Sequence, residues 1–343
     1  MANQAAIVPS AKAPLEVKSV EKYTPGAGEI LVKNEVISFN PVEAKIARLA
    51  LLPAPYPFIP GLSCGGTVEG VGQGVTGFKV GDKVAVRRNF AAGGNRYGSF
   101  QKFVVARIEA ASKLPDGVDL TAAASLIGNL TTTIGLFNVR AGLERPSLGD
   151  SATAKNKKIL IYGGSSSVGS LSVQWVAQAG YQVVTTSSPK NKNFVSKLGA
   201  AAVIDHTQPQ DALVKELVAQ GPYDLVADVI ALPPTVAVNA AVLAAQGGGD
   251  VLATLPAFGP ETLPDGVKRV FGSWPDIIAE EDTTGVEEWA YRTYFPQSLA
   301  KGKLIPQPIK KITGGLGEGV NKALDLMIAG EVSGVKLVAD PWE

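Results

Sequence analysis

KILIYGGSSSVG, residues 158–169, is the most informative stretch of this chain. Its first half, residues 159–162, is a short apolar run typical of a strand buried on both faces of a parallel sheet. Two glycines follow, and a segment with helical spacing then continues as far as Gly180. In a strand–turn–helix unit of this kind, the free N–H groups of the first helical turn and the helix dipole face a bound phosphate. We therefore expect this turn to bind a pyrophosphate.

The glycine spacing alone leaves an alternative open. Against the pattern G-x-G-x-x-G, the chain has Gly164 and Gly169 in the first and third positions but Ser166 in the second. An ordinary turn between a strand and a helix, which binds no ligand, has the same appearance.

The next predicted strand, residues 181–186, favours a particular ligand. Sites for NAD carry an acid about 20 residues beyond the glycines, which binds the ribose 2′-hydroxyl. Residues 183–193 contain no Asp or Glu, and the chain has TTSSPKNKN at 185–193. Because hydroxyls and cations suit a 2′-phosphate, the sequence predicts NADPH rather than NADH. The alternative is a solvated, lysine-rich surface turn.

Composition restricts the class of protein. A chain of 343 residues with 45% hydrophobic and 18% charged residues predicts about two domains with ample cores. The net charge of +1 offers no field for nucleic acid. We find no apolar span of membrane length and no signal peptide at the N-terminus. We therefore expect a cytoplasmic protein that binds neither nucleic acid nor membrane.

Cysteine and histidine are too few for several kinds of site. Cys64 and His206 are each unique, so a disulfide within the chain and a zinc site built from Cys and His are excluded. Sites made of carboxylates for harder metals stay open, although no EF-hand-like run of acids occurs. We expect no metal. Cys64 is expected to be a small buried residue rather than a nucleophile.

The pattern of elements predicts two architectures. The first 110 residues alternate or run apolar as in short strands, with six glycines in residues 63–77 that suit strongly bent strands. From residue 158, strands alternate with helices, which predicts an α/β domain with a doubly wound sheet of six parallel strands. These strands are expected at 158–162, 181–186, 202–204, 225–228, 251–255 and 267–271. The C-terminal segments are expected to rejoin the β-rich domain.

Several motifs carry a family resemblance. SFNPVEAK at 38–45 matches an N-P-x-D-x-K signature, and GTVEGVGQGVTGFKVGDKV at 66–84 matches a long glycine-rich strand motif. With residues 158–169 and GEVSGVKLV at 330–338, the chain resembles the zinc-independent, quinone oxidoreductase-like branch of the medium-chain dehydrogenase/reductase family. It is most similar to the fungal ToxD-like and CipB-like group, which includes trans-acting enoyl reductases that serve polyketide synthases.

The resemblance implies a fold and a division of the chain. A GroES-like distorted β-barrel domain, which binds the substrate, would comprise residues 1–125 and 301–343. A Rossmann domain, which binds NADPH, would comprise residues 126–300. The zinc alcohol dehydrogenases of the wider family have Gly-His-Glu where this chain has Gly61, Leu62 and Ser63. Their zinc-dependent activity is therefore not expected.

The resemblance also implies roles for individual residues. Lys45 and Thr132 would be catalytic, although Thr131 and Thr133 are alternatives because LIGN at 126–129 replaces the usual Leu-Pro-x-Gly. Lys45 could equally be a solvated surface residue, and Thr132 an ordinary helix threonine. The cofactor-binding residues would be Asn40, Pro41, Val42, Glu43, Ala44, Gly163, Gly164, Ser165, Ser166, Ser167, Val168, Gly169, Ser187, Ser188, Pro189, Lys190, Asn191, His206, Ala253, Thr254, Ser333 and Gly334. His206 replaces a tyrosine of the group and would stack on adenine.

The expected chemistry is reduction of an activated C=C bond. Hydride from NADPH would go to the β-carbon of an α,β-unsaturated carbonyl, with Lys45 and Thr132 stabilising the enolate. The proton could come from Tyr56, Tyr97 or water. The substrate would be a small molecule or a carrier-bound thioester, with a polyketide synthase as a candidate partner and a monomer or homodimer as the assembly. A quinone or aldehyde/ketone reductase and a non-catalytic NADPH-binding protein are the alternatives.

Overall fold

The computed structural model describes residues 2–51, 53–88, 93–149 and 151–343. Contacts divide the chain into two units, one comprising Met1–Gly128 with Glu288–Glu343 and the other Asn129–Glu287. The first boundary lies close to the expected one at 125/126. The second differs, because residues 288–300 group with the first unit. Their contacts explain this: Arg87 Nε donates to the hydroxyl of Tyr291 at 2.8 Å, and Arg292 lies over the Phe78 ring.

A sheet of six parallel strands forms the centre of the second unit. Its order is β10-β9-β8-β11-β12-β13. The strands are β8 (Lys158–Tyr162), β9 (Gln182–Ser187), β10 (Ala202–Asp205), β11 (Leu225–Asp228), β12 (Gly249–Ala253) and β13 (Val267–Phe271). The central strand β8 buries Ile159, Leu160 and Ile161 completely, as its apolar run predicts. The order reverses direction between β8 and β11, so the predicted doubly wound Rossmann sheet is confirmed.

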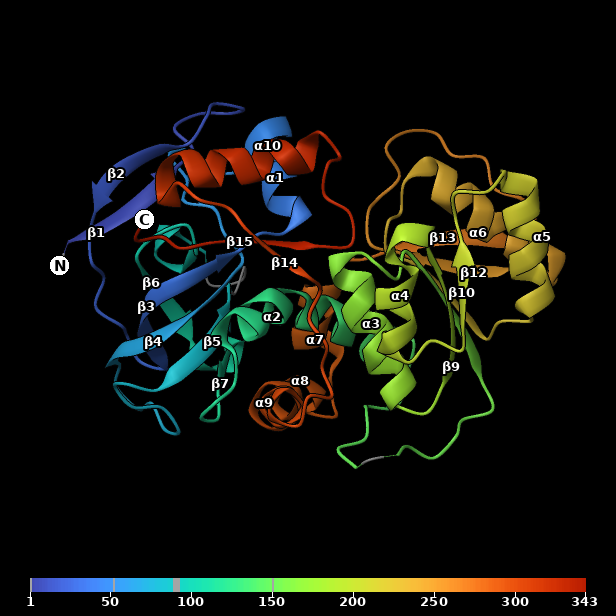
Figure 1. Ribbon diagram of the computed structural model, residues 1–343, viewed down its shortest axis with the longest axis horizontal. Coiled ribbons are helices and arrows are strands. Elements are labelled where there is room, and N and C mark those ends of the chain that lie inside the picture. Colours follow the sequence, from blue (N-terminus) through green and yellow to red (C-terminus); the bar gives the residue numbers. More distant parts are fainter. Residues whose placement is uncertain (1, 52, 89–92, 150) are drawn as a thin grey trace. The chain divides into compact units, whose positions relative to one another are not determined.

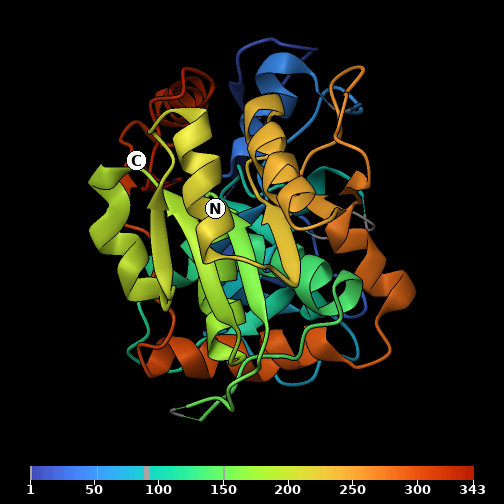
Figure 2. The ribbon, with the colours of Figure 1, turned by 90° about the vertical axis from the view of Figure 1, so that its right-hand side faces the viewer.

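Helices cover both faces of this sheet. Figure 1 shows α3 and α4 on one face and α5 and α6 on the other, and Figure 2 shows the strands from the side of α5 and α6. Their bounds are α3 (Ser167–Gln178), α4 (Lys192–Val195), α5 (Gln210–Gln220) and α6 (Pro233–Ala245), and a further helix, α7 (Trp274–Glu281), follows β13. The prediction missed α7. Its signals are Ser273 at the N-cap, Pro275 and Asp276 in the first turn, and the buried pair Trp274 and Ile278, four residues apart.

The first unit contains a seven-stranded sheet in which all pairs are antiparallel except β14 and β15, which pair in parallel. Its order is β14-β15-β3-β4-β5-β7, and β6 also pairs with β3. The strands are β3 (Glu29–Ser38), β4 (Ser63–Val71), β5 (Lys83–Arg87), β6 (Phe103–Arg107), β7 (Ala111–Lys113), β14 (Ile309–Lys311) and β15 (Lys336–Ala339), with β1 (Asn3–Ile7) and β2 (Glu16–Val20) as a separate pair. The register between β3 and β4 shifts twice. A Cβ on Gly66 would lie 2.0 Å from the Lys33 carbonyl oxygen, so only glycine permits this approach.

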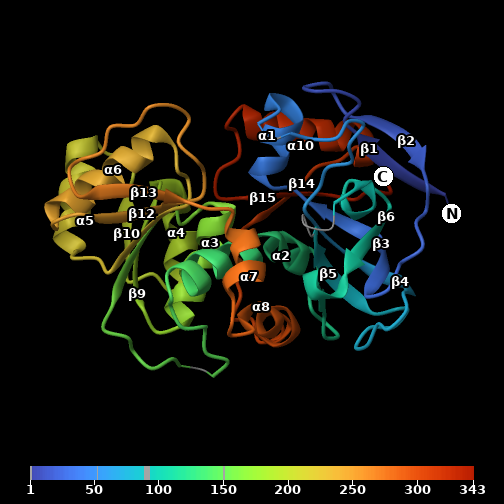
Figure 3. The same cartoon turned by 180° about the vertical axis from the view of Figure 1, so that it is seen from behind.

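The C-terminal segments rejoin this sheet, as expected. Strand β15 pairs with β3, and α10 (Val320–Ile328) packs against α1 (Pro41–Leu49), as Figure 3 shows from behind. The remaining helices of the unit are α8 (Val286–Trp289), which spans the boundary, and α9 (Phe295–Ala300).

The expectation that the chain has no apolar span of membrane length was wrong. Helix α2 (Leu120–Ile134) continues as a π-helix over Gly135–Arg140, and this 21-residue segment is long and apolar enough to cross a membrane. However, 78% of its apolar window is buried within the protein, which is typical of a core helix. The sequence search missed it because Thr, Ser and Gly interrupt the apolar residues.

Candidate active site

The turn after β8 depends on three glycines. Gly163 has a positive φ of 99°, and its N–H donates to the Thr186 hydroxyl at 2.9 Å. A Cβ on Gly164 would lie 2.3 Å from the Thr185 hydroxyl oxygen. A Cβ on Gly169 would lie 2.1 Å from the Gly163 carbonyl oxygen. The glycines therefore allow the start of α3 to lie directly against the end of β8.

Ser166 takes the place of the second glycine of the pattern. It is the N-cap of α3, and its hydroxyl accepts the N–H of Gly169 at 3.0 Å. Ser165, Ser167 and Val168 beside it are half-buried. The first N–H groups of a helix have no partner within the helix, so this turn has the donors and the dipole that a pyrophosphate needs. The residues thus fit the predicted group.

The end of β9 carries hydroxyls followed by a cation. Ser187 and Ser188 are buried, Pro189 and Lys190 are exposed, and Asn191 Nδ2 donates to the Ser188 hydroxyl at 3.3 Å. This set fits a phosphate because hydroxyl, amide and ammonium groups all donate hydrogen bonds to it.

A carboxylate lies on the neighbouring strand. Asp205 pairs in register with Ser187, but its Oδ1 accepts the backbone N–H of Thr207 at 2.8 Å and the Thr207 hydroxyl at 2.7 Å. These hydrogen bonds from Thr207 lower the pKa of Asp205. The Asp205 carboxyl group is therefore ionised, and its Oδ1 is hydrogen-bonded within the turn that follows β10. The adjacent His206 is exposed, with its ring 6.3 Å from the Tyr162 ring.

The predicted residues of the second unit lie at one edge of the sheet. The turn after β8, the segment after β9, His206 after β10, and Ala253 and Thr254 at the end of β12 all follow the carboxyl ends of parallel strands. Ligands of open parallel sheets bind at this edge, next to the point where the strand order reverses. The Thr254 N–H donates to the Asp228 carbonyl oxygen at 3.2 Å, which ties the end of β12 to β11.

Among the candidate threonines of α2, burial separates one from the others. Thr131 and Thr133 are buried, and the Thr133 hydroxyl lies 3.3 Å from that of Ser172. Thr132 is half-buried. Thr132 is therefore the most exposed residue of the three, and its catalytic role stays a prediction.

In the first unit, Asn40 and Glu43 begin helix α1 and face the interior. Asn40 is the N-cap, and its backbone N–H donates to Glu43 Oε2 at 2.7 Å. Glu43 Oε1 accepts the N–H of Leu62 at 2.6 Å, and Asn40 Nδ2 donates to the Ser63 hydroxyl at 3.2 Å. The side chains of Asn40 and Glu43 therefore already have hydrogen-bond partners within this unit. Of the other residues of the motif, Ala44 is buried, Pro41 is exposed, and Val42 and Lys45 are half-buried.

Lys336 completes this interior network, and the sequence analysis missed it. Its Nζ donates to Asn40 Oδ1 at 2.7 Å, and the residue is 1% exposed. Burial raises the pKa of Glu43 to about 7 and lowers the pKa of Lys336 to about 8. The available signal was a lysine within the apolar run Val335–Val338 of the C-terminal motif. Just before it, Ser333 is exposed and Gly334 is buried with a φ of 67°.

The remaining candidates for chemistry differ in their surroundings. Burial lowers the pKa of Lys45 on α1. Tyr97 is buried and donates to a Glu29 carboxylate oxygen, whereas Tyr56 is half-buried. Cys64 is fully buried, and burial raises the pKa of its thiol, as a packed core residue requires. In the ranges that the structure describes, no group of three His, Cys, Asp or Glu side chains could hold a metal ion.

Comparison with known proteins decides the family. Residues 26–116 match the alcohol dehydrogenase GroES-like domain. The chain is 33% identical to the trans-enoyl reductase himH of Aspergillus japonicus, with 98% of this chain and 97% of that protein covered. The chain belongs to the medium-chain dehydrogenase/reductase family. It is an oxidoreductase, and its predicted resemblance to fungal trans-enoyl reductases is confirmed.

Solved structures show the fold of this medium-chain dehydrogenase/reductase. A quinone oxidoreductase of Pseudomonas syringae pv. Tomato DC3000 has a TM-score of 0.76 at 24% identity, covering 99% of this chain and 100% of its own. A mycobacterial protein in complex with NADPH also has a TM-score of 0.76, at 22% identity and with the same coverage. The predicted combination of a GroES-like and a Rossmann domain is thereby confirmed.

Proposed function

We propose that this oxidoreductase uses NADPH to reduce the activated C=C bond of an α,β-unsaturated carbonyl compound. The observation that carries the proposal is the end of β9, where two buried serines and the exposed Lys190 stand in place of an acid, beside the glycine turn after β8. The name of the relative himH, a trans-enoyl reductase, supports the type of reaction.

The cofactor would be held along the carboxyl edge of the parallel sheet. The N-terminus of α3, with Ser165 and Ser167 beside it, would bind the pyrophosphate through N–H groups. Ser188, Lys190 and Asn191 would bind the phosphate on the adenosine ribose. The ionised Asp205 lies on the next strand, and its Oδ1 is held by Thr207. The adenosine phosphate would therefore meet donors from β9 rather than a free acid.

When bound, NADPH supplies the hydride that the β-carbon of the substrate accepts. Negative charge then develops on the carbonyl oxygen, and the Lys45 ammonium and the Thr132 hydroxyl would each stabilise it. A donor placed in this way contributes about 3–4 kcal/mol to the transition state. Since burial lowers the pKa of Lys45, its ammonium is partly stripped of water and interacts more strongly with such a charge. Tyr56 or water would protonate the α-carbon, because the Tyr97 hydroxyl is bound to Glu29.

The substrate class follows from the relative and from the chemistry together. An enoyl thioester carried by a synthase suits a protein similar to a trans-enoyl reductase, and a polyketide synthase is the partner that we propose. We further propose that the reaction takes place in the cytoplasm and needs no zinc, since the single Cys and single His cannot build a zinc site.

A panel of substrates tests the proposal. Purified protein is mixed with NADPH or NADH and with an enoyl thioester, an enone, a quinone or an aldehyde, and oxidation of the nicotinamide is followed by absorbance. We expect turnover of the thioester and the enone with NADPH, unchanged by a zinc chelator. Turnover of quinones or aldehydes alone contradicts the C=C assignment. NADPH binding without any turnover would make the protein a non-catalytic NADPH-binding protein.

A further inference from the structure

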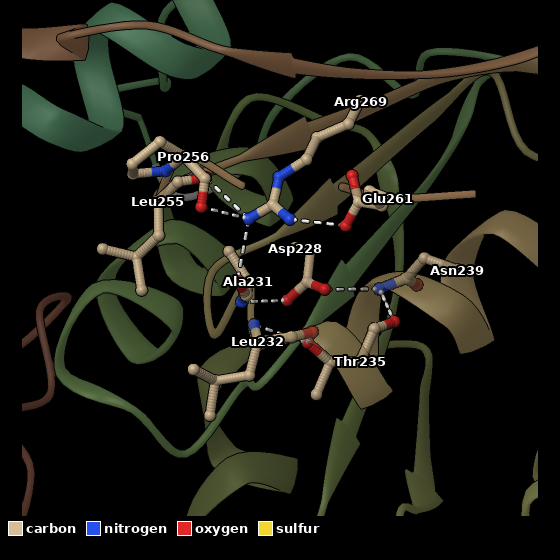
Figure 4. A network of polar contacts seen from close by, with 9 residues as sticks. All are labelled: Asp228, Ala231, Leu232, Thr235, Asn239, Leu255, Pro256, Glu261 and Arg269. Carbon is tan, nitrogen blue, oxygen red and sulfur yellow. Dashed lines mark hydrogen bonds and ion pairs between the residues drawn. The ribbon is translucent and has the colours of Figure 1, made fainter. Parts of the chain in front are cut away.

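Arg269, on β13, connects two loops at the carboxyl edge of the sheet (Figure 4). Its Nη2 donates to the carbonyl oxygen of Ala231 at 2.8 Å, in the loop after β11. The same nitrogen donates to the carbonyl oxygens of Leu255 at 2.7 Å and Pro256 at 3.0 Å, in the loop after β12. Its Nη1 pairs with Glu261 at 2.7 Å, and the Arg269 side chain is only 6% exposed. One guanidinium therefore holds backbone acceptors of two loops.

Asp228 supports the first of these loops from inside. This fully buried residue ends β11, and its Oδ1 accepts the N–H groups of Ile230 at 3.0 Å and Ala231 at 2.7 Å. Its Oδ2 accepts Asn239 Nδ2 at 3.1 Å, as Figure 4 shows. Ala231 has a positive φ of 55°, which costs a residue other than glycine free energy. The carboxylate and the guanidinium together stabilise this conformation.

The supported loop contacts the proposed phosphate-binding turn. A Cβ on Gly163 would lie 2.6 Å from Ile230 Cγ1, so the Ile230 side chain packs directly on the first glycine of that turn. Strand β11 also neighbours β8, at the position where the strand order reverses. A chain of contacts thus runs from Arg269 through Ala231 and Ile230 to Gly163. The same guanidinium holds the loop that follows Ala253 and Thr254.

We propose that Arg269 is a positioning residue for the cofactor. It fixes the loops after β11 and β12 so that they receive the ribose–nicotinamide half of NADPH. This inference rests on the proposed function. Arginine suits the task because its planar fork donates in several directions at once, to three carbonyl oxygens and one carboxylate here, whereas the ammonium of lysine is a single point.

Binding measurements on two ligands test the role of Arg269. The variants are Arg269→Gln and the milder Arg269→Lys, and the control is Lys268→Gln, which removes an exposed cation from the same strand. The ligands are NADPH and adenosine 2′,5′-bisphosphate, which contains only the adenosine half and would bind at β9. Both dissociation constants are measured by calorimetry, and steady-state kinetics give KM for NADPH and kcat separately.

We expect Arg269→Gln to weaken NADPH binding about tenfold, in line with the loss of a charge-assisted hydrogen bond, and Arg269→Lys to restore little of it. Binding of adenosine 2′,5′-bisphosphate should stay within about twofold, and Lys268→Gln should change neither ligand. An equal loss for both ligands, or unchanged NADPH binding in both Arg269 variants, overturns the positioning role. If the wild-type protein binds neither ligand, the proposed function itself fails, and this inference fails with it.

Discussion

The start of α3 and the start of α1 are both helix N-termini, yet they are built in opposite ways. At α3 the capping group is a neutral serine hydroxyl, and glycines at 163, 164 and 169 keep the surroundings small. At α1 a carboxylate of the helix itself, Glu43, binds the N–H of the N-cap, and Lys336 closes the network behind Asn40. A helix N-terminus is thus suited to an external anion only where the chain has not provided an anion of its own.

The largest expected effect is on the interior network. Lys336→Met removes one charge of a buried set, and we expect it to lower the free energy of unfolding by about 3–5 kcal/mol in urea denaturation. The control Lys310→Met, at an exposed position on β14, should change it by less than about 0.5 kcal/mol. If Lys336→Met and Lys310→Met have the same free energy of unfolding, the contacts of Lys336 do not stabilise the start of α1.

Lys45 tests whether the start of α1 also has a chemical role. Lys45→Ala should lower kcat about a hundredfold and leave the dissociation constant of NADPH within about twofold, because the ammonium would act on the developing charge. The exposed Lys322→Ala on α10 is the control and should have wild-type kinetics. Wild-type turnover of Lys45→Ala would remove this residue from the mechanism.

The pH dependence of stability also distinguishes the two helix N-termini, because the start of α1 contains the buried carboxyl group of Glu43 whereas a serine hydroxyl caps α3. The pKa of Glu43 rises from 4.5 to about 7 in the folded protein. The folded state therefore holds the proton more tightly, and this stabilisation is complete below pH 4.5 and lost as the pH rises to about 7. Relative to Glu43→Gln, the wild type should lose up to about 3 kcal/mol over this window in chemical denaturation. A difference that is constant with pH contradicts the raised pKa.

Gly169 tests whether the start of α3 must lie close to the end of β8 for the cofactor to bind. A Cβ at this position would lie 2.1 Å from the Gly163 carbonyl oxygen. We expect Gly169→Ala to lower the free energy of unfolding by about 2 kcal/mol and to weaken NADPH binding about tenfold, because the helix start must move away from β8. Gly149→Ala, where the nearest atom would be 3.4 Å away, is the control. An unaffected affinity in Gly169→Ala would separate the glycine turn from cofactor binding.

The smallest effect is expected at the end of β9. Lys190→Ala should weaken NADPH about tenfold and leave NADH unchanged, because the ammonium would contact only the extra phosphate. Wild-type protein should bind NADPH at least about tenfold more tightly than NADH. Equal affinities for the two nucleotides in a titration contradict the assignment of NADPH.

The sequence predicted the parallel sheet well because most of its strands are short apolar runs bounded by turn residues, although β13 also carries Lys268 and Arg269. It missed β7 and β14, since three residues are too few for an alternation to be visible. It missed Lys336 because a lysine is expected at the surface, and only the fold brings it against Asn40, 296 positions away in the chain. Arg269 was missed for the same reason: besides Glu261, its acceptors are backbone oxygens of loops, which no side-chain pattern marks.

The binding of Asp205 to Thr207 has a consequence for how such proteins diversify. In the turn after β10, the Asp205 carboxylate is hydrogen-bonded to Thr207 and so stabilises the turn itself. On the proposed function, the choice between NADPH and NADH would therefore depend on a few side chains that follow Ser187, the last paired residue of β9. Substitutions there would alter coenzyme preference without disturbing the sheet. On that proposal, coenzyme choice and fold integrity would be separable traits on which selection, or an engineer, could act one at a time.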